Sequence, residues 1–229
     1  MKLNKKSCDL QSCVMCRLCQ KEWLPAINAN RKTYQYAKGE KVFEEDEEVK
    51  GMFFITSGLV KVHKHWGEEK ELILRIASNG DILGHRGLGS DTIYPASATA
   101  LTSTDICFVD LEFFTSTLKV NTGFLYQLMM FFAGELKESE KRMRNLAHMP
   151  AKGRIANALI SLQNKFGTSP SGAINVILSR QDFASYTGTT YETFFRLLNE
   201  LSEEGAITTE NKEIKIKDLE KLLVYMVVG

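Results

Sequence analysis

The chain has 229 residues, of which 44% are hydrophobic and 25% charged, and its formal net charge is +1. This composition excludes disordered, collagen-like and coiled-coil fibre classes, and the length favours two domains. Because the charge is close to zero, any nucleic-acid binding must use a local surface. The longest apolar stretches, such as residues 128–134, are too short to span a bilayer, and the N-terminus lacks the apolar core of a signal peptide. We therefore expect a cytoplasmic protein without a membrane segment.

The N-terminal segment is distinguished by its cysteines. Four of the five lie within the first 21 residues, namely Cys8, Cys13, Cys16 and Cys19. No helical or strand periodicity is visible there, so the sequence predicts an arm over residues 1–30 whose order depends on its cysteines. In the cytosol, clustered cysteines bind metal more often than they form disulfides. The spacing suits an iron–sulfur cluster, whereas zinc held by all four thiols and redox-reactive thiols are the alternatives.

From about Tyr34 to Asp110 the chain alternates polar and apolar residues in short segments. The segments are residues 33–37, 41–43, 52–55, 59–64 and 71–76, and the turns between them contain Gly39, Gly58, Gly67 and Gly80. Many short strands separated by glycine-containing turns are typical of an antiparallel sandwich or barrel. The sequence predicts a β-barrel domain over residues 31–115.

Beyond residue 110 the apolar residues recur at steps of three and four. They are Phe124, Leu125, Leu128, Phe131, Phe132, Leu136, Met143 and Leu146. This pattern predicts one amphipathic helix of roughly 25 residues within residues 116–150. A helix of that length extends beyond the core of one domain, so we expect part of its apolar stripe to pack against a second copy in a homodimer. Packing on its own barrel alone is the alternative.

After Pro150 and Gly153 a second helical region begins. Within it, residues 178–198 are typical of two helices joined by a tight turn, with Ser179 and Thr190 as helix caps and Gly188 in the turn. The second helix is expected to bury Phe194, Leu197, Leu198 and Leu201. Two short strands, 206–209 and 213–217, follow as a hairpin. Two helices joined by a turn and followed by a hairpin predict a winged helix-turn-helix over residues 151–229. The second helix of such a motif enters the major groove of DNA.

The exposed face of this second helix carries side chains suited to DNA. Glu192 and Arg196 lie one helical turn apart. Arginine can bond guanine bidentately and glutamate can accept a hydrogen bond from cytosine, although an intrahelical ion pair between them is the alternative. The side chains suited to phosphate oxygens are Ser179, Gln181, Thr190 and Thr193. Arg180, Thr189 and Tyr191 complete the predicted DNA-binding set.

The order of barrel, long helix and winged helix-turn-helix is similar to that of the CRP/FNR family of bacterial transcription regulators. The matching segments are residues 179–184, 188–193, 196–198 and 204–205, together with 38–40, 54–58 and 80–84 in the barrel. The resemblance implies an α+β chain with an N-terminal double-stranded β-helix (a cyclic-nucleotide-binding-like jelly-roll barrel), a dimerisation helix and a C-terminal winged helix-turn-helix.

The same resemblance implies a homodimeric regulator that binds double-stranded DNA and contacts RNA polymerase if it activates transcription. An enzyme is not expected, because no nucleophile is accompanied by its base. Phe195 stands where family members usually carry a small residue, and Tyr191 replaces a residue that often helps to choose the base sequence. The operator therefore cannot be copied from better-known relatives.

The sensor region departs from the family's pattern for cyclic nucleotides. His85 stands in place of the glutamate that holds the ribose, and Pro95 in place of the arginine that neutralises the phosphate. A buried phosphate without its counter-charge costs several kcal/mol, so cAMP is not expected. The candidate effector pocket consists of Gly84, His85, Arg86 and Ser97, with a small molecule, a nucleotide or haem on His85 as alternatives. His63 and His65, two apart on a strand, are expected at the surface.

The oxygen-sensing FNR branch of the family holds an iron–sulfur cluster through three N-terminal cysteines and one barrel cysteine. Residues 98–107 resemble the segment leading to that fourth ligand, and Cys107 falls at the matching position. The resemblance implies a cluster on Cys13, Cys16, Cys19 and Cys107, with Cys8 as an alternative ligand. The FNR branch spaces its last two arm cysteines more widely than Cys16 and Cys19 are spaced here. For Cys107, the alternative to a ligand is a small buried hydrophobic residue.

Overall fold

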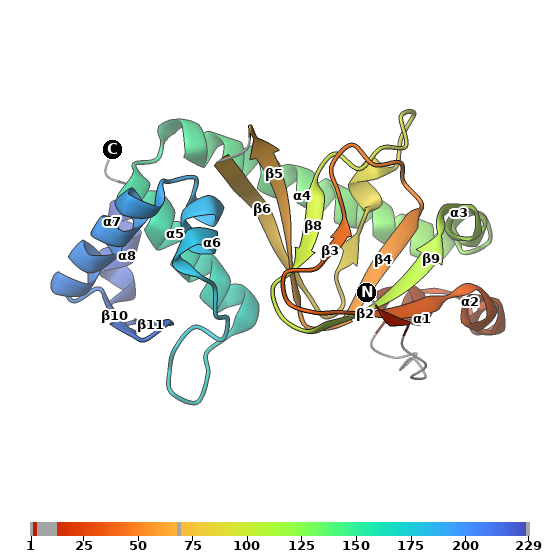
Figure 1. Ribbon diagram of the computed structural model, residues 1–229, viewed down its shortest axis with the longest axis horizontal. Helices are drawn as coiled ribbons and strands as arrows, with labels where there is room; N and C mark the ends of the chain where they lie inside the picture. The colour runs from red at the N-terminus through yellow and green to blue at the C-terminus, as the bar shows by residue number, and fades with distance from the viewer. Residues whose placement is uncertain (1, 4–12, 68–69, 228–229) are drawn as a thin grey trace. The chain divides into compact units, whose positions relative to one another are not determined.

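The computed structural model describes residues 2–3, 13–67 and 70–227 of the chain (Figure 1). Two compact units divide it: the first comprises residues 1–64 and 74–135, and the second residues 65–73 and 136–229. The predicted fold class is confirmed, because a jelly-roll of antiparallel sheets, a long helix and a winged helix-turn-helix follow one another along an α+β chain.

Two sheets build the barrel of the first unit, with strand orders β1-β2-β9-β4-β7 and β3-β8-β5-β6. The strands are β1 (Lys2–Leu3), β2 (Lys32–Tyr36), β3 (Lys41–Phe43), β4 (Gly51–Ser57), β5 (Leu59–Trp66), β6 (Lys70–Ser78), β7 (Ile82–Leu83), β8 (Ser97–Ala100) and β9 (Thr104–Asp110). Neighbouring strands are distant in sequence: Cys107 of β9 lies opposite Thr33 of β2 and Phe54 of β4. Such non-consecutive antiparallel pairing is characteristic of a jelly-roll.

Strand β4 is the centre of the barrel core. Its first five residues, Gly51 to Ile55, are all buried, although alternate residues of a strand point to opposite faces. Both faces are therefore covered, one by the barrel interior and the other by helix α3 (Leu111–Val120), which contacts β4. This is why residues 52–55 form a continuous apolar run.

The N-terminal segment contains more regular structure than the sequence indicated. It forms α1 (Val14–Leu18), the 3₁₀ helix η1 (Lys21–Trp23) and α2 (Leu24–Asn30). The amide of Gln20 donates to Asn121 Oδ1 at 2.8 Å, and Trp23 Nε1 donates to Thr117 Oγ1 at 3.0 Å. Helices this short do not show a 3.6-residue period, which explains the difference. Cys8 lies outside the described residues.

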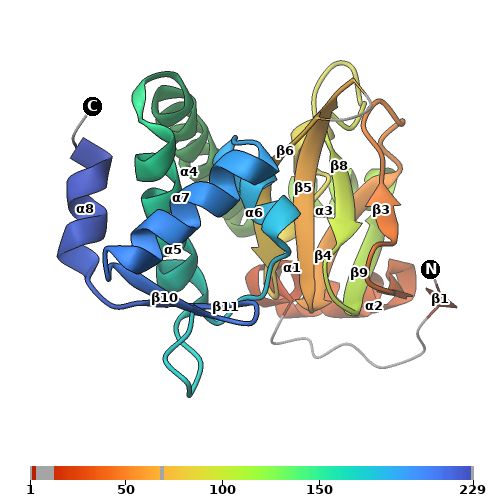
Figure 2. The ribbon, with the colours of Figure 1, turned by 60° about the vertical axis from the view of Figure 1, so that its left-hand side comes forward.

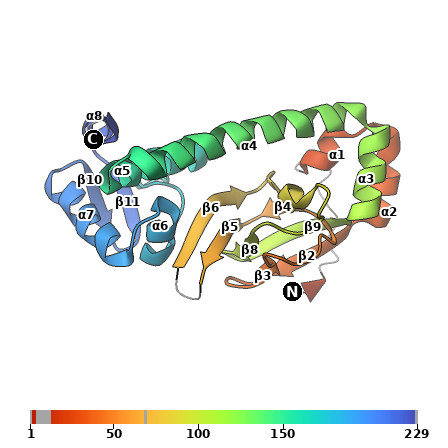
Figure 3. The same cartoon turned by 90° about the horizontal axis from the view of Figure 1, so that it is seen from above.

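The long helix is α4 (Thr122–His148), which has 27 residues and is drawn as one continuous helix (Figure 3). It follows α3, whose first turn is capped by Asp110: the carboxylate accepts a hydrogen bond from the Phe113 amide at 2.8 Å. Phe124 and Leu128 of α4 join the core of the first unit. Within the described part of the chain, no helix is both long enough and apolar enough to cross a bilayer.

The second unit contains the winged helix-turn-helix (Figure 2). Its elements are α5 (Ala151–Phe166), α6 (Arg180–Thr187), α7 (Tyr191–Glu203), β10 (Ile207–Glu210), β11 (Glu213–Ile216) and α8 (Leu219–Val227). The predicted hairpin is confirmed: β10 pairs with β11, and Asn211 in their turn has a φ of 55°. Helix α8 packs on α5, where a Cβ on Gly153 would lie 2.4 Å from the Tyr225 carbonyl oxygen.

Candidate functional site

Two capped helices and a tight turn build the helix-turn-helix, as the sequence predicted. Ser179 Oγ accepts a hydrogen bond from the Asp182 amide at 3.0 Å, and Thr190 Oγ1 accepts one from the Thr193 amide at 3.2 Å. Gly188 ends α6 with a φ of 64°, in the left-handed region where a side chain would be strained. These local interactions fix where α7 begins.

The two faces of α7 differ sharply in burial. The four apolar residues expected to be buried are indeed buried, namely Phe194, Leu197, Leu198 and Leu201. Phe194 stacks on Phe183 of α6 with ring centroids 5.4 Å apart, which holds the two helices together. The exposed residues of the opposite face are Tyr191, Glu192, Phe195, Arg196 and Asn199.

The predicted DNA-binding side chains lie along this face and at the two helix starts. Ser179, Gln181, Thr190, Tyr191, Glu192 and Arg196 are exposed, and Arg180, Thr189 and Thr193 are half-buried. Among the described residues, Arg196 pairs not with Glu192 but with Glu200, at 2.5 Å between Nη1 and Oε1. The carboxylate of Glu192 is therefore not neutralised by Arg196.

Two arginines, which the sequence did not single out, attach the turn of the helix-turn-helix to the preceding helices. Arg154 of α5 donates to three carbonyl oxygens: Met149 at 2.8 Å, Thr187 at 2.9 Å and Gly188 at 3.1 Å. Arg142 of α4 donates to the Tyr186 carbonyl at 2.9 Å. Backbone carbonyls are present at every residue, so these contacts leave no signal in the sequence.

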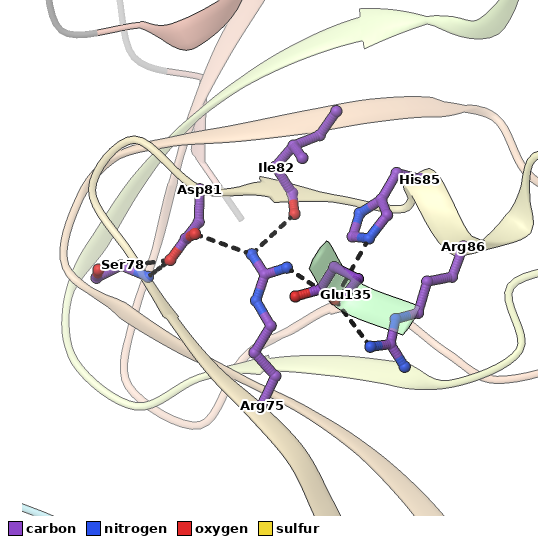
Figure 4. Close-up of polar contacts among 7 residues, drawn as sticks. All are labelled: Arg75, Ser78, Asp81, Ile82, His85, Arg86 and Glu135. Carbon is purple, nitrogen blue, oxygen red and sulfur yellow. Dashed lines mark hydrogen bonds and ion pairs between the residues drawn. The ribbon is translucent and has the colours of Figure 1, made fainter. Parts of the chain in front are cut away.

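In the first unit, three of the four candidate effector residues, Gly84, His85 and Arg86, lie in or directly before the 3₁₀ helix η2 (His85–Gly87). Figure 4 shows His85 and Arg86. Gly84 has a φ of 85°, and a Cβ there would lie 3.1 Å from the Gly51 carbonyl oxygen. His85 is buried, with its ring 5.0 Å from Phe131 and 5.4 Å from Phe132 of α4. Ser97 does not line the cavity beside His85.

Glu135 of α4 brings the basic residues of this region together, and sequence reasoning missed it. Its Oε2 lies 2.8 Å from Arg86 Nη2, 3.2 Å from Arg75 Nη1 and 3.8 Å from His85 Nε2. Arg75 also pairs with Asp81 at 3.1 Å (Figure 4). Glu135 follows an apolar run and precedes a charged one, so in the sequence it resembles an ordinary exposed helix residue.

The electrostatics of this cluster follow from its burial. Burial alone would raise the pKa of the Glu135 carboxyl, but His85, Arg75 and Arg86 outweigh it and hold that pKa well below its usual range. Burial lowers the pKa of His85, and Glu135 offsets only part of this effect. The cluster therefore contains a carboxylate, two guanidinium groups and a neutral imidazole at neutral pH.

The cavity beside this cluster is small, about 20 Å³, which is room for roughly one water molecule. Its lining residues are Phe43, Val62, Arg75, Leu83, Gly84, His85, Arg86, Tyr94, Pro95 and Ala96. The rings of Phe43 and Tyr94, which line the cavity, stack with centroids 4.1 Å apart. This one cavity is smaller than a cyclic nucleotide or a haem.

The four described cysteines lie in the core of the first unit. Cys13, Cys16 and Cys19 occupy the N-cap, the middle and the C-cap of α1, and Cys107 is on β9. Their exposed fractions are 1%, 4%, 8% and 1%, and they belong to one apolar cluster. Burial, with a smaller contribution from Cys13, raises the pKa of the Cys19 thiol to about 12.

The described cysteines are all thiol donors, but they do not form a compact group of the size that zinc requires. Among the described residues, no three cysteines bring their Sγ atoms within 4.8 Å of one another. Tetrahedral zinc with Zn–S bonds of about 2.3 Å needs its sulfur atoms about 3.8 Å apart. An iron–sulfur cluster places its thiolates around a larger core. Burial also shields the thiols from dissolved oxidants, which disfavours the alternative of exposed reactive thiols.

The expectation that His63 lies at the surface was wrong. Its side chain is 2% exposed, and its Nε2 lies 2.9 Å from Thr99 Oγ1 of β8. The alternation of β5 fails at this point, because Val62 and His63 are both buried. His65 is exposed, as expected.

Comparison with known proteins identifies two segments. Residues 33–121 match the model of the cyclic nucleotide-binding domain, and residues 153–225 match that of the Crp-like helix-turn-helix domain. A CRP-like cAMP-activated global transcriptional regulator of Mycobacterium tuberculosis is 26% identical over 201 residues, which cover 87% of this chain and 90% of the relative. An anaerobic regulatory protein of Bacillus subtilis is 27% identical over 192 residues, which cover 82% of this chain and 79% of the relative.

The fold is also found among solved structures. FixK2 from Bradyrhizobium japonicum superimposes with a TM-score of 0.77 at 23% sequence identity, over 87% of this chain and 98% of that protein. At this identity the likeness concerns the fold.

Proposed function

The chain belongs to the CRP/FNR family of DNA-binding transcription regulators, and we propose that it works as a cytoplasmic homodimer whose barrel senses a redox or gaseous signal. The observation that carries the DNA-binding part is the capped helix-turn-helix with one fully packed and one exposed face of α7. An activating role would add RNA polymerase as a partner.

The exposed face of α7 supports a division of roles. Glu192 and Arg196 lie in the N-terminal half of the helix, the part of a recognition helix that faces base edges. The side chains at the two helix starts, where free amides favour phosphate, are Ser179, Arg180, Gln181, Thr189, Thr190 and Thr193. The Arg196–Glu200 pair is exposed and is worth at most about 1 kcal/mol, so DNA can displace it.

Replacing Arg196 by alanine is expected to cost about 1–3 kcal/mol of operator binding and to relax the base preference at one position. Fluorescence anisotropy with duplexes substituted at each position of the half-site measures both effects. The matched control is Glu200→Gln, which removes the partner of Arg196 and should leave affinity undiminished. Unchanged affinity and selectivity in Arg196→Ala would show that this side chain does not read a base.

The homodimer is supported by the apolar side chains that α4 exposes. They are Leu125, Tyr126, Met129, Met130, Leu136, Met143 and Leu146. A long row of exposed apolar residues is typical of a surface that binds another protein. The α4 helix of a second copy carries the same row and can pack against it. A dimer presents two α7 helices to half-sites about one turn of DNA apart.

For the sensor, we infer that Cys13, Cys16, Cys19 and Cys107 hold an iron–sulfur cluster. Their burial in one apolar cluster supports this, and the Bacillus subtilis relative is named an anaerobic regulatory protein. A bound cluster supplies a centre that reacts reversibly with an oxidant or a gas. The rival signal, a nucleotide, is suggested by the name of the Mycobacterium tuberculosis relative, but the 20 Å³ cavity disfavours it.

Protein purified without oxygen is expected to be brown and to contain iron and acid-labile sulfide. Cys107→Ser, a near-isosteric change on β9, should abolish iron binding because it removes one of four thiolates, whereas Cys8→Ser should retain it. Absorption spectra and metal analysis measure both variants. Colourless protein that contains stoichiometric zinc would show that the cysteines bind zinc instead of an iron–sulfur cluster. Protein that contains neither iron nor zinc would exclude both kinds of metal site.

A further inference from the structure

Two aromatic side chains stack on the exposed face of α7. Tyr191 is the first residue of the helix and Phe195 lies one turn later. Their ring centroids are 6.2 Å apart and their planes differ by 9°. Tyr191 is 43% exposed and Phe195 47% exposed. The two rings therefore form a small apolar patch on the exposed face, and contiguous apolar patches are a feature of interaction surfaces.

The pair lies outside the buried stripe of α7. The stripe of α7 that packs against the rest of the unit consists of Phe194, Leu197, Leu198 and Leu201. Tyr191 and Phe195 follow the i, i+4 row next to Glu192 and Arg196. The aromatic pair is therefore part of the face that the proposed function directs towards DNA, at the N-terminal half of the helix.

We propose that Tyr191 and Phe195 select thymine by apolar contact with its 5-methyl group in the major groove. This inference rests on the proposed function. The thymine methyl is the apolar group that base pairs present in the major groove, and phenylalanine is suited to contact it. The phenyl ring of Phe195 has no hydrogen-bonding atom, so it cannot read the donor and acceptor pattern of the other bases.

The geometry of the pair also limits where the thymines lie. The two centroids are separated by 6.2 Å, close to two base-pair rises of about 3.4 Å. The selected thymines should therefore lie within two steps of each other. Arg196 follows Phe195 directly and is suited to guanine, so the half-site should carry a guanine close to this thymine pair.

The test uses full-length protein and duplexes that it selects from a random-sequence pool. Half-sites with thymines within two steps of each other are expected. Replacing one such thymine by deoxyuridine removes only the methyl group, and it should weaken binding about fourfold, as expected for a methyl worth about 0.8 kcal/mol. Phe195→Ala should bind the thymine and deoxyuridine duplexes equally at one of the two thymine positions, while keeping its guanine preference and the discrimination at the position that Tyr191 contacts.

Leu223→Ala serves as the matched control, because Leu223 is an exposed apolar residue of α8 and this variant should keep the full discrimination. Circular dichroism establishes that each variant is folded. Equal binding of thymine and deoxyuridine duplexes by the unaltered protein overturns the inference, as does undiminished discrimination in both Tyr191→Ala and Phe195→Ala. If the unaltered protein binds no duplex, the proposed function itself fails, and that result differs from binding without methyl discrimination.

Discussion

Replacing Arg154 by alanine is expected to lower the free energy of unfolding of the winged helix-turn-helix by about 3 kcal/mol. The guanidinium donates to the carbonyls of Met149, Thr187 and Gly188. Alanine leaves all three acceptors without this partner, and two of them, in the last residue of α6 and in its C-cap, lie where the chain turns towards α7. Operator affinity should therefore fall as well, although Arg154 is not on the exposed face of α7. Urea denaturation followed by circular dichroism measures the stability.

Two further variants separate this role from a general effect of charge. Arg154→Lys keeps the charge but not the planar fork that reaches several acceptors, so it should lose most of the same stability. Arg144→Ala removes an exposed arginine that bonds one acceptor, Oδ1 of the buried Asn145, at 3.0 Å, and it should cost about 1 kcal/mol, clearly less than Arg154→Ala. An Arg154→Ala protein as stable as Arg144→Ala would contradict the assigned role.

Replacing Glu135 by glutamine is expected to lower the free energy of unfolding of the first unit by about 2–3 kcal/mol. The loss is somewhat smaller than for breaking a fully buried ion pair, because the cluster is partly exposed to solvent. The change removes the charge shared by Arg75 and Arg86. Arg75 keeps its contact with Asp81, whereas Arg86 loses its carboxylate partner. The measurement is urea denaturation at neutral pH, and Glu140→Gln, an exposed position on the same helix, is the control.

The pH dependence of this effect has a definite sign. The pKa of Glu135 in the folded protein is held below its usual value of 4.5, so the unfolded chain takes up the proton first as the pH falls. The stabilisation is complete above about pH 4.5 and is lost progressively below it. The difference between the unaltered protein and Glu135→Gln should shrink over that range. A difference that stays constant down to the acid-unfolding limit would show that the Glu135 charge is not its source.

The helix-turn-helix could be predicted almost completely from the sequence. Its caps are hydrogen bonds between residues three apart, Ser179 with Asp182 and Thr190 with Thr193. Its turn depends on the single glycine Gly188, and its packed face on the apolar period of α7. Each of these features depends on residues within a few positions, so local chemistry determines them. The short helices α1 and α2 were missed because they contain too few residues to show a period.

The partner of Arg196 shows where local reasoning stops. Glu192 and Glu200 are both four residues from Arg196, and both are permitted partners on a helix. The structure pairs it with Glu200. The burial of His63 is a similar case, because it depends on Thr99 of the neighbouring strand, which the alternation along β5 does not reveal.

The sequence by itself determined the order of barrel, long helix and helix-turn-helix, and the residues that α7 exposes, because these depend on periodicity and on contacts within one turn of chain. Only the tertiary structure decided that Glu135 joins Arg75, Arg86 and His85, and that Arg154 holds the turn before α7. Glu135 and Arg86 are 49 residues apart, and Arg154 and Thr187 are 33 apart. Ionic and hydrogen-bonding side chains have many equivalent partners along a chain, and folding brings one set within reach.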